Sequence, residues 1–412
     1  MESSCLPAAL SSLKIAGERD RPDPDVPSTA NADEAVSSPT QASVFDPYAK
    51  YLSLFSRSKE VDAHNVGDTS ADLHKMKIAP LFSSQVHEKA LSTFTFSTAQ
   101  QQPYPQFGLL GMSMSAEAGS TPSRFRPEDR LVFSNTAEPW STFICGSQGS
   151  GKSHTLSCLL ENNLLPSNQI GSLSKPLTGM IFHYDKFSNF NCGQICEAAY
   201  LCSAGVPVKI LVAPTSFSKM QKQYHNLPGL PPGSRSPTVL PLYFSQEQLS
   251  IDVMMTLMAV HDTGEAAPLY ISAIRQLLRE IAMDNQDKQG FDYDNFRQQL
   301  GLLSLTEAQC APLDLRLQLL ESVLLETQQT ARSRADYDKI WDFRPGTLTI
   351  VDLSDQFVNT SDACALFSIC LKLFMGGWQA NPRIVALDEA HKFLTNTTES
   401  TKLTSDLISI IR

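Results

Sequence analysis

The stretch FICGSQGSGKSHT, from Phe143 to Thr155, places three glycines around one lysine that a hydroxyl residue follows directly. Its spacing, Gly146-x-x-x-x-Gly151-Lys152-Ser153, is that of a phosphate-binding loop. Glycines let backbone N–H groups turn inward around phosphate oxygens, and the N-terminus of a following helix adds positive potential. We therefore predict a strand over 141–146, then this loop, then a helix over 152–163 with leucines on one face.

Two side chains of the loop have expected tasks in nucleotide binding. Lys152 can reach the β- and γ-phosphates, and the Ser153 hydroxyl can ligate Mg²⁺. His154 follows the motif, and the pattern assigns it no chemistry. The residues predicted to contact the nucleotide are Gly146, Ser147, Gln148, Gly149, Ser150, Gly151, Lys152, Ser153 and His154.

A second motif, IVALDEAH (384–391), places two acids at the end of an apolar run. Asp388 would hold Mg²⁺ through water, and Glu389 would polarise an attacking water beside the γ-phosphate. The alternative is a strand-to-helix turn that simply ends in two acids. The phosphate loop elsewhere in the chain favours the catalytic interpretation.

Short apolar runs alternate with helical patterns from Leu131 onward, which predicts an α/β fold with a mainly parallel sheet flanked by helices. The predicted strands cover 131–134, 180–185, 208–214, 347–354 and 384–387, and a helix is expected over 361–376. A mainly helical insertion is expected at about 217–345, with helices near 246–262, 267–285, 292–302 and 313–331. The whole core would span 128–412.

The N-terminal part of the chain has a different composition. Residues 1–45 are rich in Ser, Pro, Ala and Asp, which predicts a disordered arm. The segment 46–127 is expected to be partly ordered, with a helix over 46–56 and a strand-like alternation over 92–97.

The composition of the chain limits the partners and the cellular compartment that we expect for this protein. The net charge of −10 gives no general reason to expect a polyanion partner, and no apolar run is long enough to span a bilayer. Nine cysteines without a signal peptide are typical of reduced thiols in a cytoplasmic or nuclear protein. Cys192, Cys196 and Cys202 together with His183 match no common zinc spacing, so we interpret these cysteines as small buried apolar residues.

Three better-known nucleotide-binding classes do not fit. The letters DEAH suggest a helicase, but there the acid lies much closer behind the lysine, and a second motor domain is needed. A GTPase would carry an Asn/Thr-Lys-x-Asp motif, and an ABC transporter ATPase a Leu-Ser-Gly-Gly-Gln signature; the sequence has neither.

The segments ICGSQGSGKSHT, MIFHYDKF, TIVDLS and IVALDEAHKFL together resemble the HerA/FtsK-type P-loop ATPases, over about residues 130–412. With PQFGLLG (105–111), the chain is also similar to a group of fungal P-loop ATPases. The resemblance implies ATP and Mg²⁺ as cofactors, in the additional-strand class with a catalytic glutamate. Lys152 and Ser153 are then the phosphate and Mg²⁺ residues, Asp388 is the second Mg²⁺ acid, and Glu389 is the base. Asp185 matches a recurring acid of the family whose role stays open.

The resemblance also implies that part of the sheet is missing. In this class a strand ending in a polar sensor follows the acid strand in sequence and lies between it and the phosphate-loop strand. The sequence ends at DLISIIR, so we expect a C-terminally incomplete chain or one that another chain completes. Arg332 or Arg334 could act in a neighbouring subunit, the alternative being solvated surface.

Two functions stay open at this point. The first is an ATP-hydrolysing motor, expected to be a homo-oligomer, that acts on DNA or protein; DNA comes from the resemblance alone. The second is an ATP-binding regulatory or remnant module with little hydrolysis.

Overall fold

The computed structural model describes residues 69–93, 102–113, 130–166, 170–186, 194–258, 269–284, 291–303, 305–325, 337, 339–376 and 381–411. The predicted disordered arm over 1–45, the helix over 46–56, Cys192, Arg332 and Arg334 lie outside these residues.

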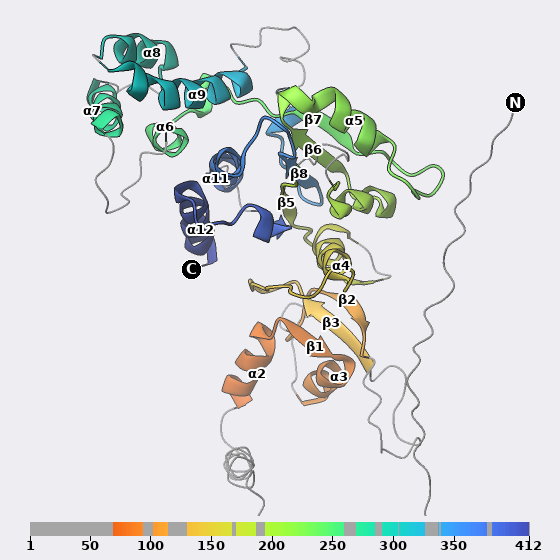
Figure 1. Ribbon diagram of the computed structural model, residues 1–412. Helices are drawn as coiled ribbons and strands as arrows, with labels where there is room; N and C mark the ends of the chain where they lie inside the picture. The colour runs from red at the N-terminus through yellow and green to blue at the C-terminus, as the bar shows by residue number, and fades with distance from the viewer. Residues whose placement is uncertain are drawn as a thin grey trace, which may run out of the picture. The chain divides into compact units, whose positions relative to one another are not determined.

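Five parallel strands form the larger sheet, in the order β7-β6-β8-β5-β9 (Figure 1). They are β5 (Thr178–His183), β6 (Val208–Val212), β7 (Thr238–Pro241), β8 (Leu348–Asp352) and β9 (Arg383–Asp388). The apolar runs of β5, β6 and β8 are buried on both faces, as parallel strands covered by helices require. The predicted α/β class and four of the predicted strands are confirmed, whereas β7 was not predicted.

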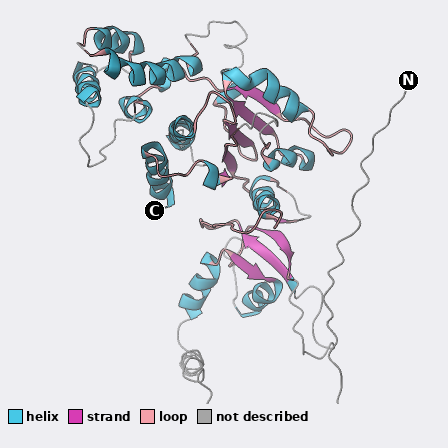
Figure 2. Ribbon diagram, viewed as in Figure 1, coloured by secondary structure: helices cyan, strands magenta, loops and turns pink. Residues whose placement is uncertain are grey.

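Helices cover both faces of this sheet (Figure 2). On one face, α4 (Lys152–Leu164), η3 (Glu197–Ala204) and α5 (Phe217–His225) pack against Ile181, Ile210 and Ile350. On the other face, α11 (Thr360–Gly376) packs against Met180, Phe182 and Val351. The α4 and α11 helices confirm predicted helices, and α12 (Thr398–Ile411) follows β9.

Four helices between β7 and β8 belong to the same core as α11. They are α6 (Ile251–Leu257), α7 (Leu269–Asp284), α8 (Tyr293–Gly301) and α9 (Glu307–Val323). Each overlaps a predicted helix. The stretch 217–345, however, opens with α5 and β7, and β7 is a strand of the parallel sheet. Within the described part of the chain, no helix combines the length and apolarity needed to cross a membrane.

The predicted strand over 141–146 is wrong. These residues have no strand assignment, and the Phe143 side chain is 87% exposed. An apolar run becomes a strand only when a neighbouring strand supplies its ladder of hydrogen bonds. The strand that ends in Asp388, β9, pairs with β5 and stands at an edge of the sheet, so among the described residues no strand joins 141–146 to it.

A smaller antiparallel sheet, in the order β1-β3-β2-β4, precedes the parallel one in the chain. Its strands are β1 (Leu81–Ser83), β2 (Phe107–Met112), β3 (Leu131–Asn135) and β4 (Gly171–Ser172), with helices α2 (Thr69–Ile78) and α3 (Ser84–Thr93). The predicted strand over 131–134 is therefore real but belongs to this second sheet. Of the strand-like run over 92–97, Ser92 and Thr93 end α3 and the rest lies outside the described residues.

Asn162 of α4 links the helix to the smaller sheet. Its Nδ2 donates to Leu109 O (3.1 Å) and to Ser134 Oγ (3.0 Å). The close approach needs glycine at 108, since a Cβ there would lie 2.2 Å from Asn162 Cγ.

Asn162→Ala is expected to lower the free energy of unfolding by about 2–3 kcal/mol, because it removes one buried and one partly buried hydrogen bond to the smaller sheet. The neighbouring Asn163→Ala is the matched control, with a cost of about 1 kcal/mol, because among the described residues Asn163 Nδ2 donates to Leu159 O in its own helix and not to the smaller sheet. Urea denaturation measures both. Equal costs would show that Asn162 does not stabilise the contact with the smaller sheet.

Candidate functional site

The glycine-rich loop has the backbone that anion binding requires. Gly149 (φ +77°) and Gly151 (φ +86°) adopt the left-handed conformation that residues with a side chain rarely adopt. Gly151 is also the N-cap residue of α4, where no side chain caps the helix. The first N–H groups of α4 are therefore left for an external acceptor, and the helix dipole favours an anion there.

The predicted phosphate lysine lies over this loop. Lys152 Nζ donates to the loop carbonyl Ser147 O at 3.0 Å, a contact that a phosphate oxygen could replace. Ser153 is half-buried at the start of α4, whereas His154 is exposed and its Nε2 lies 3.7 Å from Cys158 Sγ. The segment 145–151 is exposed throughout, so it is accessible to a ligand.

The direction of α4 brings the loop to the carboxyl edge of the parallel sheet. The C-terminal end of α4 lies at the amino end of β5, because Leu177 N donates to Asn163 O (2.8 Å) and a Cβ on Gly179 would lie 3.3 Å from Leu164 Cδ1. Leu156, Leu160 and Leu164 of α4 pack in one cluster with Ile181 of β5, so we infer that the helix lies along this strand and runs opposite to it. At 1.5 Å per helical and 3.3 Å per strand residue, α4 and β5 each span about 20 Å. The N-terminus of α4 and its loop therefore face the edge where the strands end.

Polar side chains meet at that same edge because the strands are in register. His183, at the end of β5, is aligned with Asp352 of β8 and with Asp388 of β9. His183 Nδ1 lies 3.1 Å from Asp388 Oδ2, with the histidine fully buried and the Asp388 side chain 11% exposed. The predicted Mg²⁺ acid thus has a histidine partner that the sequence patterns did not indicate.

Each residue of this pair shifts the pKa of the other toward its charged form. Burial alone would lower the pKa of His183, but the negative charges of Asp352 and Asp388 raise it to about 9. Burial likewise would raise the pKa of Asp388, yet the hydrogen bond and charge of His183 hold it below its usual range. The pair is therefore an imidazolium and a carboxylate at neutral pH.

Glu389 directly follows β9 in a strained backbone conformation. Its φ of 53° makes it the one residue other than glycine with a positive φ among those described. Such conformations cost about 1–3 kcal/mol and are concentrated at functional sites. Its Oε2 lies 3.4 Å from His391 Nδ1 and 4.0 Å from Lys392 Nζ, and the side chain is 18% exposed. The carboxylate thus lies near the His391 ring and the Lys392 ammonium group and is accessible to solvent.

Asp185 joins this group from the end of β5. Its Oδ1 accepts from Lys392 Nζ at 2.9 Å, and its Oδ2 accepts from the N–H of Gln194 at 2.7 Å. Burial raises its pKa, but these two hydrogen bonds outweigh it and lower the pKa overall. Asp185, which matches a recurring acid of the HerA/FtsK-type family, therefore contacts two segments. It binds Lys392 in the segment after β9, and it binds the backbone at Gln194.

Sequence reasoning missed several polar residues at the carboxyl edge. Tyr224 of α5 donates its hydroxyl to Asp352 Oδ2, and Thr215 Oγ1 donates to Asp355 Oδ2 at 2.8 Å. The sequence could have indicated Asp352 and Asp355, because IVDLSD places both acids where a buried strand ends. Tyr224 lies in a helix and had no such signal.

The structure brings Asp185, Asp388 and Glu389 together at one edge and directs the loop toward it. Among the described residues, no hydrogen bond or ion pair joins the loop to Asp388 or Glu389. The chain matches no model of a known protein family, and no curated protein matches it.

Proposed function

We propose that this protein binds Mg²⁺·ATP in the loop 146–153 and hydrolyses it, as a P-loop ATPase of the HerA/FtsK type. The direction of α4 carries the proposal, because it points an uncapped helix N-terminus toward the sheet edge that bears Asp388 and Glu389. Ligands of open parallel sheets bind beyond the carboxyl ends of the strands.

The loop residues fit a triphosphate. The left-handed glycines at 149 and 151 orient the backbone, and Lys152 supplies a cation that now donates to a loop carbonyl. Ser153 and Asp388 would hold Mg²⁺, which when bound neutralises charge on the phosphates. Asp388 Oδ2 is hydrogen-bonded to His183. Asp388 would therefore contact the Mg²⁺ ion through a water molecule.

Glu389 is the residue that we assign to the attacking water. Its carboxylate is partly exposed beside Asp388, and within the described part of the chain it has no side-chain partner closer than 3.4 Å. A carboxylate so placed can accept a proton from water, while Lys152 and the helix N-terminus position the phosphates.

A specific observation favours the second candidate, an ATP-binding module with slow hydrolysis. The segment 141–146 is outside the parallel sheet, and no described contact joins the loop to Glu389. Nucleotide binding needs the loop alone, whereas hydrolysis also needs the base beside it. Turnover in the purified protein separates the two functions.

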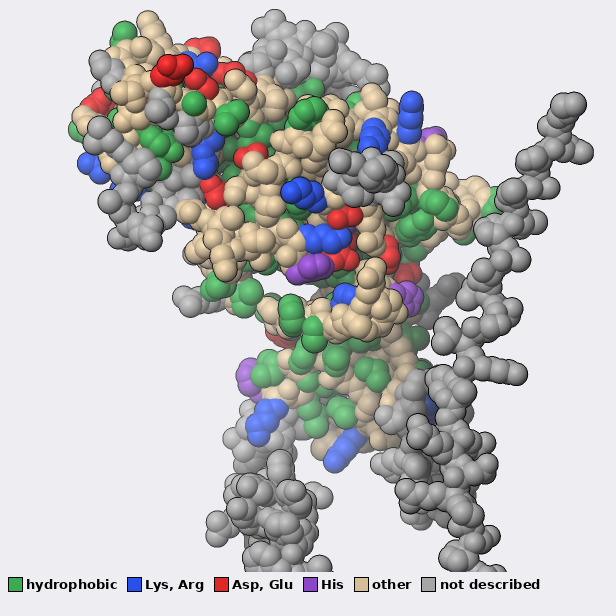
Figure 3. All heavy atoms as spheres, in the orientation of Figure 1, with side chains coloured by type: hydrophobic (Ala, Val, Ile, Leu, Met, Phe, Trp, Pro, Cys, Tyr) green, Lys and Arg blue, Asp and Glu red, His purple; other side chains and the backbone are tan. Residues whose placement is uncertain are grey.

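The charge distribution does not favour DNA as the substrate. The chain has a net charge of −10, and Lys and Arg side chains are spread out on the face drawn in Figure 3. DNA binding gains its affinity from several cations placed along phosphates. A homo-oligomer remains a prediction of the resemblance.

Lys152→Ala is expected to weaken Mg²⁺·ATP binding about thirtyfold, since one charge-assisted hydrogen bond contributes roughly 2 kcal/mol. Isothermal titration of the nucleotide-free protein with Mg²⁺·ATP measures this. Lys175→Ala is the control, because Lys175 is exposed and lies outside the loop. Equal affinities in the two variants, or no binding by the wild type, would overturn the proposed function.

A further inference from the structure

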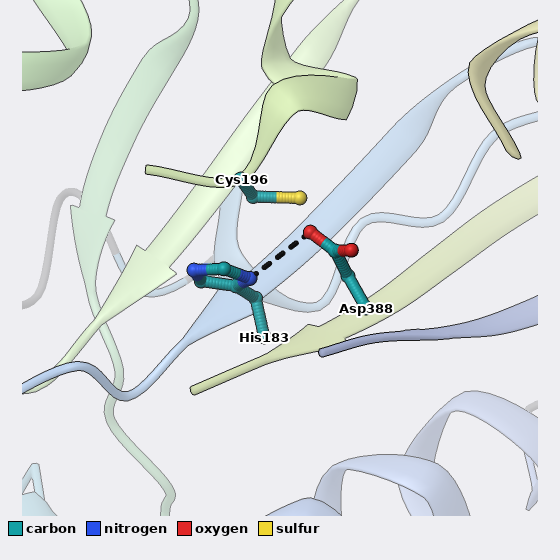
Figure 4. Close-up of side chains that lie close together, drawn as sticks. All are labelled: His183, Cys196 and Asp388. Atoms are coloured by element: carbon teal, nitrogen blue, oxygen red, sulfur yellow. Dashed lines mark hydrogen bonds and ion pairs between the residues drawn. The ribbon is translucent and has the colours of Figure 1, made fainter. Parts of the chain in front are cut away.

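Three potential metal ligands of different chemistry meet beneath the carboxyl edge (Figure 4). They are His183 at the end of β5, Cys196 just before η3, and Asp388 at the end of β9. Their nitrogen, sulfur and oxygen atoms all lie within 4.8 Å of one another. His183 and Cys196 are fully buried.

The hydrogen bonds of His183 require a positive centre between it and Asp388. Its Nε2 lies 2.8 Å from Gln194 O, and a carbonyl oxygen only accepts, so Nε2 carries a hydrogen. Its Nδ1 lies 3.1 Å from Asp388 Oδ2, which as a carboxylate oxygen also only accepts. Either a proton or a metal ion must therefore lie on the Nδ1 side.

The hydrogen bonds around His183 and Cys196 are of the kind that usually orients metal ligands. A histidine ligand almost always donates its other ring N–H to a carbonyl or carboxylate, as His183 does to Gln194 O. Gln194 is itself fixed by its N–H to Asp185, and the Cys196 N–H donates to the Tyr224 hydroxyl at 3.1 Å. The segment 194–196 is thus anchored on both sides of the cluster.

We propose that His183 Nδ1, Cys196 Sγ and Asp388 Oδ2 form a binding site for Zn²⁺. One nitrogen, one thiolate and one carboxylate suit this borderline-soft ion better than Mg²⁺ or Ca²⁺, which take oxygen ligands. Ligand atoms in a tetrahedral zinc site lie about 3.3–3.7 Å apart, so His183 Nδ1 and Asp388 Oδ2, now 3.1 Å apart, would separate slightly, and atoms of the cluster that lie up to 4.8 Å apart would move closer. The fourth ligand would be water, which can enter beside Asp388, the partly exposed member.

Binding releases two protons to solvent, one from the Cys196 thiol and one from His183 Nδ1. The site shares Asp388 with the proposed Mg²⁺·ATP site, but none of its three ligand atoms belongs to the loop 146–153, and binding of Zn²⁺ needs no nucleotide. Its test can therefore use the protein without nucleotide.

Titration of chelator-treated full-length protein with Co²⁺, then Zn²⁺, tests the proposal. We expect one high-affinity ion per chain, a thiolate-to-cobalt charge-transfer band, and loss of that band when Zn²⁺ displaces Co²⁺. Cys196→Ser should abolish the band and weaken Zn²⁺ binding on the order of 100-fold. Cys202→Ser is the matched control, since Cys202 is also buried and lies outside the cluster, and it should bind like the wild type.

Absence of a thiolate band in the folded wild-type protein would overturn the proposal, as would a band that survives in Cys196→Ser. Asp388→Asn provides a second variant with the thiol intact. It should keep the band but weaken binding about tenfold or more, and unchanged affinity would exclude Asp388 from the site.

Discussion

Glu389→Gln is expected to lower ATP turnover by at least about 100-fold while Mg²⁺·ATP affinity stays within about twofold of the wild type. General bases contribute roughly 10²- to 10⁴-fold to rate, and an amide of the same size cannot take the proton. Glutamine also has the same cost at the left-handed φ of 53°, so folding stability should not change. Steady-state phosphate release and isothermal titration measure the two quantities.

Glu247→Gln is the matched control for this prediction, because Glu247 is exposed and lies away from β9. It should hydrolyse ATP at the wild-type rate. If Glu389→Gln retains full turnover, another group activates the water and our assignment is wrong. If the wild type binds ATP but hydrolyses it no faster than Glu389→Gln does, the protein is the ATP-binding module, our second candidate.

Much of the α/β core could be predicted from the sequence, because its strands are short apolar runs, and β8 and β9 end in the acids Asp352 and Asp388. Burial on both faces makes such runs nearly continuous, as in ILV of β6 and TIV of β8. The segment 141–146 also contains apolar residues, but no described strand pairs with it, and composition cannot reveal whether such a neighbour exists. The strand β7 escaped notice because it is short and follows a proline-rich loop.

The phosphate loop was predictable because its residues are contiguous, whereas the cluster around Asp388 was not. His183 and Asp388 are separated by more than 200 residues, and only the register of β5 with β9 places them side by side. The spacing of Cys192, Cys196 and Cys202 suggested buried apolar residues. Cys196 and Cys202 are both buried in the apolar core, as that interpretation expects, and Cys196 Sγ also lies within 4.8 Å of potential ligand atoms of His183 and Asp388.

His183→Ala is expected to lower the free energy of unfolding by about 3–5 kcal/mol in chelator-treated protein. Removing one partner of a buried ion pair leaves the other charge, here Asp388, without compensation, and Asp352 adds repulsion. His225→Ala is the control: this exposed histidine of α5 should cost less than about 0.5 kcal/mol. Asp388→Asn added to His183→Ala should restore part of the loss. A loss that the second substitution does not change would show that the cavity, not the ion pair, is responsible.

The pH dependence of stability distinguishes these causes further. Since the pKa of His183 is raised to about 9 from about 6.5 in the unfolded chain, its stabilisation is complete below pH 6.5 and is lost as pH rises through 9. The lowered pKa of Asp388 acts oppositely, with stabilisation present above about pH 4 and lost on acidification. The wild-type free energy of unfolding should therefore fall by on the order of 3 kcal/mol between pH 6.5 and 9.5. His183→Ala should lack this fall, and parallel curves for the two proteins would mean that His183 is neutral in the folded state.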